Sequence, residues 1–117
     1  MQGLSKRQVL RLTGTEIDGI GLVSLPASIT ELDLAYSEVT DRGVGNIAKL
    51  ASLEALHLGR TRVTDEGIDD LAKMTSLRRL YLWETAISDA GVTRLQRALP
   101  SCKIQSTLRN NANADQK

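Results

Sequence analysis

The sequence has little of several residue types, and each shortage excludes a class of protein. Cys102 is the single cysteine, so neither an internal disulfide nor a zinc site built on paired cysteines can form. Basic and acidic residues nearly balance, with a formal net charge of +1, so the broad basic field that is typical of nucleic-acid binding is missing. We therefore expect no nucleic acid among the partners.

Long apolar runs are also missing. No stretch approaches the roughly 18 apolar residues that a membrane-spanning helix requires, and residues 1–10 lack the apolar core of a signal peptide. These absences predict a soluble chain without a membrane partner, cytoplasmic by default. They leave open whether the chain is complete or is a segment of a larger protein.

A 24-residue repeat organises most of the sequence. Its middle copy is residues 53–76, LEALHLGRTRVTDEGIDDLAKMTS, and the segments 29–52 and 77–100 carry the same residue classes at the same offsets. The matching sets include Leu32, Leu56 and Leu80; Leu34, Leu58 and Leu82; Asp41, Asp65 and Asp89; and Gly43, Gly67 and Gly91. A fixed period of this length is the signature of a solenoid, in which each unit buries its apolar face against its neighbours.

Each repeat changes its hydrophobic period internally. The segments ELDL, ALHL and RLYL alternate apolar and polar residues, which predicts strands, whereas DRGVGNIAKL, DEGIDDLAKM and DAGVTRLQRAL have the three-and-four spacing of helices. Thr40, Thr64 and Ser88 occupy the expected helix N-caps, and the aspartate after each of them suits the helix dipole. The glycine that follows either lets neighbouring turns approach closely or adopts a backbone angle that other residues avoid. Because this pattern recurs in every copy, we interpret it as structural.

The alternation of strand and helix predicts parallel strands joined by right-handed crossovers. Strands lie about 4.8 Å apart whereas packed helices need about 8–10 Å, so the stack must curve with its sheet on the inner side. We call the sheet surface that is turned away from the helices the concave face.

The pattern resembles the leucine-rich repeat, LxxLxLxxN/CxL, and more narrowly the variant with [TS]D.G after the strand that is common in bacterial proteins. The resemblance covers roughly residues 7–105. It implies an α/β fold, a short right-handed horseshoe-shaped solenoid with a parallel sheet on the concave side and helices on the convex side. It also implies a non-catalytic protein-interaction module that needs no cofactor. The family usually has asparagine at the turn position, where this chain has Thr15, Ser37, Thr61 and Thr85, whose hydroxyls offer fewer hydrogen bonds.

We therefore divide the chain into a loose lead-in at residues 1–6, a repeat domain at 7–105 and a disordered tail at 106–117. Within the domain the repeats are about 7–28, 29–52, 53–76 and 77–100, and a C-terminal cap covers 101–105. The first repeat is irregular, and its segment 18–28 holds two glycines and a proline, which predicts a turn in place of a helix. Pro100 should end the last helix, and Ile104 should fill the core position that lies 24 residues after Leu80.

Function should reside in positions that vary between the copies. Strand alternation turns two columns outward on the concave face: Arg11, Asp33, His57 and Tyr81, and Thr13, Ala35, Gly59 and Trp83. Val9, Glu31, Ala55 and Arg79 flank them on one side, and Gly14, Tyr36, Arg60 and Glu84 on the other. All three aromatic residues and the one histidine fall on this face. Because tyrosine, tryptophan and arginine are enriched at interface hot spots, we predict that an unidentified protein partner binds Asp33, Tyr36, His57, Arg60, Arg79, Tyr81, Trp83 and Glu84.

Charge on this surface is segregated. Glu31, Asp33, Glu38 and Glu54 belong to the N-terminal repeats, whereas Arg60, Arg62, Arg78 and Arg79 belong to the C-terminal ones. Such a bipolar surface favours one orientation of a partner. The nearby acidic residues argue against phosphate or nucleic-acid binding by the arginines.

Three alternatives remain at this stage. The aromatic residues could only cover the sheet, in a chain that is a structural or capping segment of a larger repeat protein. The chain could also associate with itself through its N-terminal strand edge, because no cap precedes Val9. A hydrolase that uses Asp33 and His57 is the least favoured, because their column holds no nucleophilic serine or cysteine and an open face excludes little water. One histidine and one aspartate are too few ligands for a zinc site.

Overall fold

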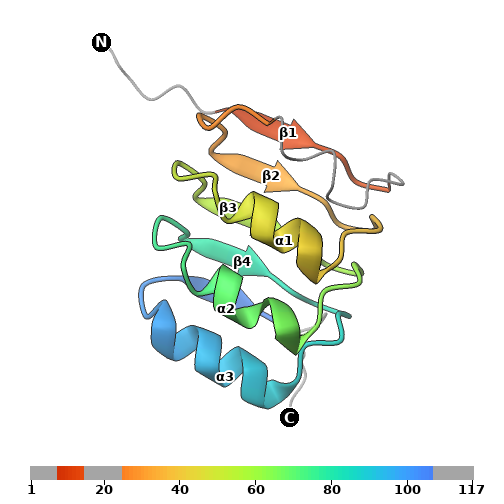
Figure 1. Ribbon diagram of the computed structural model, residues 1–117, viewed down its shortest axis with the longest axis vertical. Helices are drawn as coiled ribbons and strands as arrows, with labels where there is room; N and C mark the ends of the chain where they lie inside the picture. Colours follow the sequence, from red (N-terminus) through yellow and green to blue (C-terminus); the bar gives the residue numbers. More distant parts are fainter. Residues whose placement is uncertain (1–7, 15–24, 107–117) are drawn as a thin grey trace.

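Five parallel strands of three residues each form one sheet in sequence order (Figure 1). The computed structural model describes residues 8–14 and 25–106. The strands are β1 (Val9–Arg11), β2 (Glu31–Asp33), β3 (Ala55–His57), β4 (Arg79–Tyr81) and β5 (Lys103–Gln105). Their central residues pair in register: Leu10, Leu32, Leu56, Leu80 and Ile104. The repeat alignment, including Ile104 as the counterpart of Leu80, is confirmed. The predicted lead-in at 1–6, the turn position Thr15, most of the irregular segment 18–28 and nearly all of the tail lie outside the described residues.

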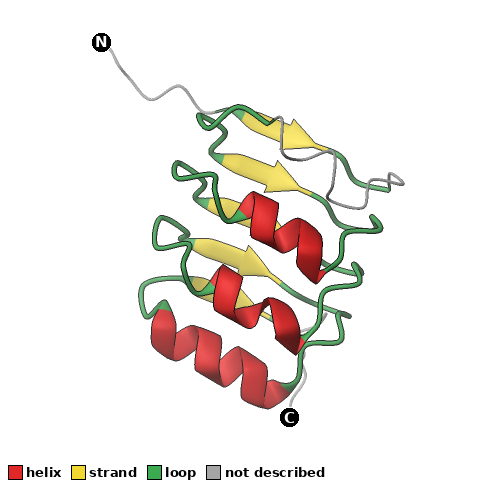
Figure 2. Ribbon diagram, in the orientation of Figure 1, coloured by secondary structure: helices red, strands yellow, loops and turns green. Residues whose placement is uncertain are grey.

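The helices all lie on one side of the sheet (Figure 2). They are α1 (Asp41–Ile47), the 3₁₀ turn η2 (Asp65–Gly67) that leads into α2 (Ile68–Leu71), and α3 (Asp89–Ala98). Helices α1 and α2, in the repeats at 29–52 and 53–76, are shorter than their apolar spacing predicts. None of the helices in the described ranges is long and apolar enough to cross a bilayer.

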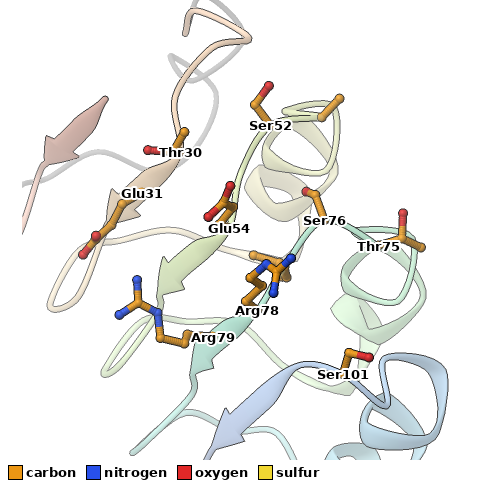
Figure 3. Close-up of a pocket in the computed structure, with 11 residues that line it drawn as sticks. Thr30, Glu31, Ser52, Glu54, Thr75, Ser76, Arg78, Arg79 and Ser101 are labelled. Atoms are coloured by element: carbon orange, nitrogen blue, oxygen red, sulfur yellow. The ribbon is translucent and has the colours of Figure 1, made fainter. Parts of the chain in front are cut away.

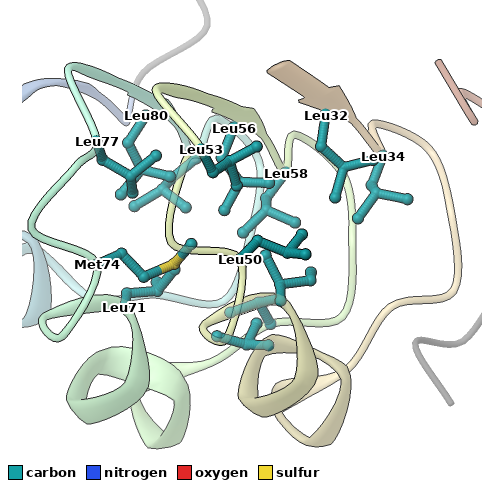
Figure 4. Close-up of a cluster of buried hydrophobic side chains, with 14 of the residues drawn as sticks. Leu32, Leu34, Leu50, Leu53, Leu56, Leu58, Leu71, Met74, Leu77 and Leu80 are labelled. Atoms are coloured by element: carbon teal, nitrogen blue, oxygen red, sulfur yellow. The ribbon is translucent and has the colours of Figure 1, made fainter. Parts of the chain in front are cut away.

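The core lies between the sheet and the helices and is built from aliphatic side chains (Figure 4). The strand positions contribute pairs that are at most 1% exposed: Leu32 and Leu34, Leu56 and Leu58, and Leu80 and Leu82. The helices contribute Val44, Ile47, Ile68, Leu71 and Leu95, which are equally buried. No aromatic side chain of the described residues belongs to this cluster, so all three remain for the surface.

The last helix ends at Ala98, two residues before Pro100, as predicted. Cys102 then lies in the core at 4% exposure, and burial raises the pKa of its thiol. A buried thiol with a raised pKa is a poor nucleophile, which confirms Cys102 as a small packing residue of the cap.

The aspartates of the first two [TS]D pairs, Asp41 and Asp65, bind the next repeat. The Asp41 carboxylate accepts hydrogen bonds from the backbone N–H of Thr64 at 2.8 Å and from its hydroxyl at 2.5 Å. Asp65 accepts the same two bonds from Ser88, at 2.8 and 2.6 Å. The bonds from Ser88 lower the pKa of Asp65. We call these four residues the aspartate ladder. Its role exceeds the predicted interaction with the helix dipole, because it fastens one repeat to the next.

The glycines of the two following repeats, Gly67 and Gly91, make room for these aspartates. A Cβ added to Gly67 would lie 2.7 Å from Oδ1 of Asp41, and one added to Gly91 would lie 2.5 Å from Oδ1 of Asp65. The φ angle of Gly67 is −89°, which any residue can adopt. Close approach is therefore the reason for these glycines, and the alternative of a special backbone angle is wrong.

Two of the three predicted N-caps form. The hydroxyl of Thr64 accepts a hydrogen bond from the N–H of Glu66 at 3.1 Å, and that of Ser88 accepts one from Gly91 at 3.0 Å. The side chain of Thr40 makes no cap bond, although its backbone is extended as a cap requires. The cap prediction is therefore wrong for α1.

Candidate functional site

The predicted outward columns lie side by side on the concave face. The parallel register places Arg11, Asp33, His57, Tyr81 and Gln105 in one row, and Val9, Glu31, Ala55, Arg79 and Lys103 in the neighbouring row. Lys103 and Gln105 extend the face by one strand, which the sequence analysis did not include. The 24-residue period could have identified them, because Lys103 and Gln105 lie 24 residues after Arg79 and Tyr81.

The outer column of the concave face has an unusual backbone. Each of its members has a positive φ angle: 74° at Gly14, 64° at Tyr36, 55° at Arg60 and 56° at Glu84. Glycine is the ordinary choice for this left-handed conformation, which costs other residues roughly 1–2 kcal/mol. The chain nevertheless carries three large polar or aromatic side chains here, and such strain tends to persist where a side chain has a function.

The turn hydroxyls hold this column in place. Thr61 donates a hydrogen bond to the carbonyl of Leu58 at 2.7 Å, and Thr85 donates one to Leu82 at 2.8 Å. The N–H of Ile87 donates in turn to Oγ1 of Thr85 at 3.4 Å. The hydroxyls therefore take over part of the network that asparagine forms in the family, as expected.

The aromatic side chains pack on one another across the strands. His57 stacks on Tyr81 with 4.5 Å between ring centroids and 11° between ring planes, and Tyr36 meets Trp83 edge to face at 5.6 Å. Tyr36 is still 53% exposed, while His57, Tyr81 and Trp83 are half-buried. We call these four residues the aromatic layer.

Small residues lie beneath and between the aromatic side chains. A Cβ on Gly59 would overlap the indole ring of Trp83, so this ring packs directly on the backbone of the turn that follows β3. Ala35 and Ala55 are 6% and 1% exposed. The expectation that these three positions are exposed is therefore wrong, because larger neighbours cover them even though they point outward.

Ion pairs link neighbouring repeats across this face. Arg60 contacts Glu84 at 2.7 Å, and its guanidinium lies 5.4 Å from the centroid of the Tyr36 ring. Arg62 likewise contacts Glu38 at 2.7 Å. These side chains are largely exposed, so each pair adds little stability and serves mainly to position the side chains.

The predicted pair of Asp33 and His57 does not form. Nε2 of His57 lies 3.1 Å from Oε2 of Glu31, one column away, whereas Oδ1 of Asp33 accepts a hydrogen bond from the N–H of Ala35 at 3.1 Å. Glu31 is thus a site residue that the sequence analysis placed on the face but did not pair with the histidine. Within residues 8–14 and 25–106, no cluster of three histidine, cysteine, aspartate or glutamate side chains could hold a metal ion.

Replacing Gly59 by alanine is expected to displace Trp83 from the sheet, because the new methyl group would occupy the space of the indole. Trp83 is the only tryptophan, so its fluorescence reports the change directly. We expect a red-shifted emission maximum with unchanged far-ultraviolet circular dichroism. Gly45→Ala is the control, because its Cβ would meet only ordinary contacts, the nearest at 3.5 Å. Identical spectra for both variants would contradict the close contact of Gly59 with Trp83.

Comparison with known proteins agrees with this geometry. A family model described as leucine-rich repeat matches residues 26–48 and 49–72. Among solved structures, actin-binding site 2 of leiomodin-1 is similar with a TM-score of 0.64 and 13% identity, over 87% of this chain and 71% of that chain. A chain from the Chaetomium Mex67:Mtr2 subunits has a TM-score of 0.62 and 19% identity, over 89% of this chain and 82% of that chain.

A leucine-rich repeat protein of Leptospira interrogans has 22% identity and a TM-score of 0.49, over 70% of this chain and 28% of that chain. Among curated proteins, none matches the sequence significantly. Likenesses at such low identity inform on the fold alone, and the leiomodin-1 and Mex67:Mtr2 structures agree in fold with the family match to two adjacent repeats. Residues 26–72 therefore match the leucine-rich repeat family, and the chain folds as a short α/β repeat solenoid.

Proposed function

We propose that this solenoid is a non-catalytic protein-interaction module that binds a protein partner on its concave face. The predicted contact residues are Asp33, Tyr36, His57, Arg60, Arg79, Tyr81, Trp83 and Glu84. The observation that carries the proposal is the aromatic layer, which is packed against itself and yet open to solvent. We further propose that the repeats belong to the [TS]D.G variant, because the aspartate ladder gives one physical reason for the threonine or serine, the aspartate and the glycine together.

Preorganisation supports this proposal. Stacking of His57 on Tyr81 and the edge contact of Tyr36 with Trp83 restrict the rings before any partner arrives. Side chains that are already ordered lose less conformational entropy on binding, so more of their contact energy appears as affinity. Arg60 belongs to the same arrangement, because it lies over the Tyr36 ring.

The similar structures support the same class of function. One is described as an actin-binding site and another as subunits that were solved together. Both descriptions concern proteins that associate with other proteins. A shared fold does not by itself transfer a function, so the proposal depends on the aromatic layer.

A self-associating scaffold is the second candidate. It is favoured by β1, which is an edge strand of the sheet and carries Val9 at 40% exposure. An open strand edge with an exposed apolar residue can pair with a second copy. Light scattering over a wide concentration range separates the candidates, since self-association through this edge requires a mass that rises with concentration.

The double substitution Tyr81→Ala/Trp83→Ala tests the concave face. Hot-spot side chains contribute about 2 kcal/mol or more, so the affinity for a true partner should fall at least about thirtyfold. The fold should persist, because the core residues Leu80 and Leu82 beside them in the sequence are unchanged. The measurement is quantitative capture of partner proteins by the intact chain, followed by titration of each captured protein.

The matched control is Lys49→Ala/Arg97→Ala, which alters two exposed residues on the helical side. Partners of the concave face should bind this control as they bind the unchanged chain. A partner that bound the Tyr81→Ala/Trp83→Ala variant with undiminished affinity would refute the concave site.

A further inference from the structure

A groove of about 800 Å³ lies at the rim of the sheet, where the middle strands begin (Figure 3). Glu54 lines it from the start of β3, and Arg78 and Arg79 line it from the start of β4. Serine and threonine residues of the turns after the helices complete the lining, among them Thr75 and Ser101. Its volume is within the usual range of about 300–1,000 Å³ for ligand sites.

The backbone fixes the charged residues of this groove. The N–H groups of Arg78 and Arg79 both donate hydrogen bonds to the carbonyl of Glu54, at 2.8 and 3.0 Å. Ala55 lies between Glu31 and Arg79 in the register of the strands and is itself buried, at 1% exposure.

The charges that line the groove are not neutralised by one another. Glu54 and Arg78 are 24 residues apart, the same offset as Glu38 and Arg62, which form an ion pair at 2.7 Å. Yet among residues 8–14 and 25–106, no ion pair involves the side chain of Glu54, Arg78 or Arg79. The groove is thus lined by two carboxylates, of Glu31 and Glu54, and by two guanidinium groups, of Arg78 and Arg79.

We propose that this groove is a second binding site and takes a dipolar ligand. Arg78 and Arg79 would hold its anionic group, a phosphate or a carboxylate, through charge-assisted hydrogen bonds. Glu54 would hold its cationic group, an ammonium, and the hydroxyl groups of the turns would supply further donors and acceptors. Peptide segments with neighbouring acidic and basic side chains carry this chemistry, as do small phosphorylated amines. The groove shares Arg79 with the predicted contact set of the concave face, whereas Glu54 and Arg78 lie outside that set.

Nuclear magnetic resonance titration of the intact chain tests the site with three probes at constant ionic strength. O-Phosphoethanolamine presents an ammonium with a phosphate, β-alanine presents an ammonium with a carboxylate, and inorganic phosphate presents the anion alone. We expect saturable shifts of the amide signals of Glu54, Arg78 and Arg79 with at least one dipolar probe, at lower concentration than with phosphate. The dipolar probe that binds identifies the anionic group. Failure of both to saturate these shifts would overturn the proposal.

Three variants separate a built site from general charge. Arg78→Ala should weaken binding of the dipolar probe at least about tenfold, because a charge-assisted hydrogen bond is lost. Glu54→Gln should lower the affinity for the dipolar probe to the affinity for inorganic phosphate. Arg42→Ala, which removes an exposed arginine of α1, should leave both affinities unchanged. Equal losses in Arg78→Ala and Arg42→Ala would overturn the proposal, as would phosphate binding as tightly as the dipolar probe. The Tyr81→Ala/Trp83→Ala variant should retain the groove, so failure of the concave face and failure of the groove are distinguishable.

Discussion

Replacing Leu56 by alanine is expected to lower the free energy of unfolding by about 2–5 kcal/mol. Leu56 is fully buried on the central strand and pairs in register with Leu32 on one side and Leu80 on the other. In a solenoid each unit is stabilised only by its two neighbours, so a cavity in the middle unit weakens both of its interfaces. A domain of this size has a free energy of unfolding of about 5–15 kcal/mol, and the variant should lose a large part of this stability.

Leu10→Ala is the matched control. It is the same substitution at the same register position, but on the edge strand β1, where the side chain is only partly buried. Leu10→Ala should lower the free energy of unfolding by less than half as much as Leu56→Ala, because fewer contacts are lost and only one neighbouring strand is involved. Urea denaturation followed by circular dichroism measures both. Equal costs at the two positions would show that the stack does not derive its stability from its middle.

The strands, their register and the core could be predicted from sequence because the repeat presents the same evidence three times. A single alternating segment such as ALHL is ambiguous, but its recurrence at a fixed offset identifies Leu56 and its counterparts as one buried row. Helix lengths could not be predicted in this way. The apolar spacing extends to Leu50 and Met74, whereas α1 ends at Ile47 and α2 at Leu71, because turn geometry between the helix and the next strand decides where each helix ends.

Membership of the concave face could also be predicted, but its pairings could not. The alternation of strands placed His57 and Tyr81 in one column, and the structure stacks them. The choice of Glu31 over Asp33 as the partner of His57 depends on side-chain length and rotamer, which no sequence pattern encodes. The left-handed backbone conformation at Arg60 could not be predicted either, because arginine has no preference for it. The glycine at the equivalent position of the first repeat was the one sequence signal.

The glycine of the [TS]D.G motif offers the sharpest test of how the repeats are joined. Gly91→Ala places a methyl group where the Asp65 carboxylate lies, and overpacking of this kind costs about 1–3 kcal/mol. The same substitution inside a helix otherwise stabilises by about 1 kcal/mol, because alanine has the higher helix propensity. We therefore expect Gly91→Ala to destabilise the intact chain. Gly45→Ala, in α1 with its nearest contact at an ordinary 3.5 Å, should stabilise it.

The decisive comparison places Gly91→Ala in an Asp65→Ala background. With the carboxylate gone, the nearest remaining atom to the new methyl group is Cγ2 of Ile87, at 3.2 Å, which can shift slightly. The effect of Gly91→Ala should then change sign and become mildly stabilising, as measured by urea denaturation of the four proteins of the cycle. Such a reversal would mean that the aspartate of one repeat dictates the glycine of the next. If Gly91→Ala destabilised both backgrounds equally, the two positions would be independent, and their recurrence at a fixed offset would need another cause.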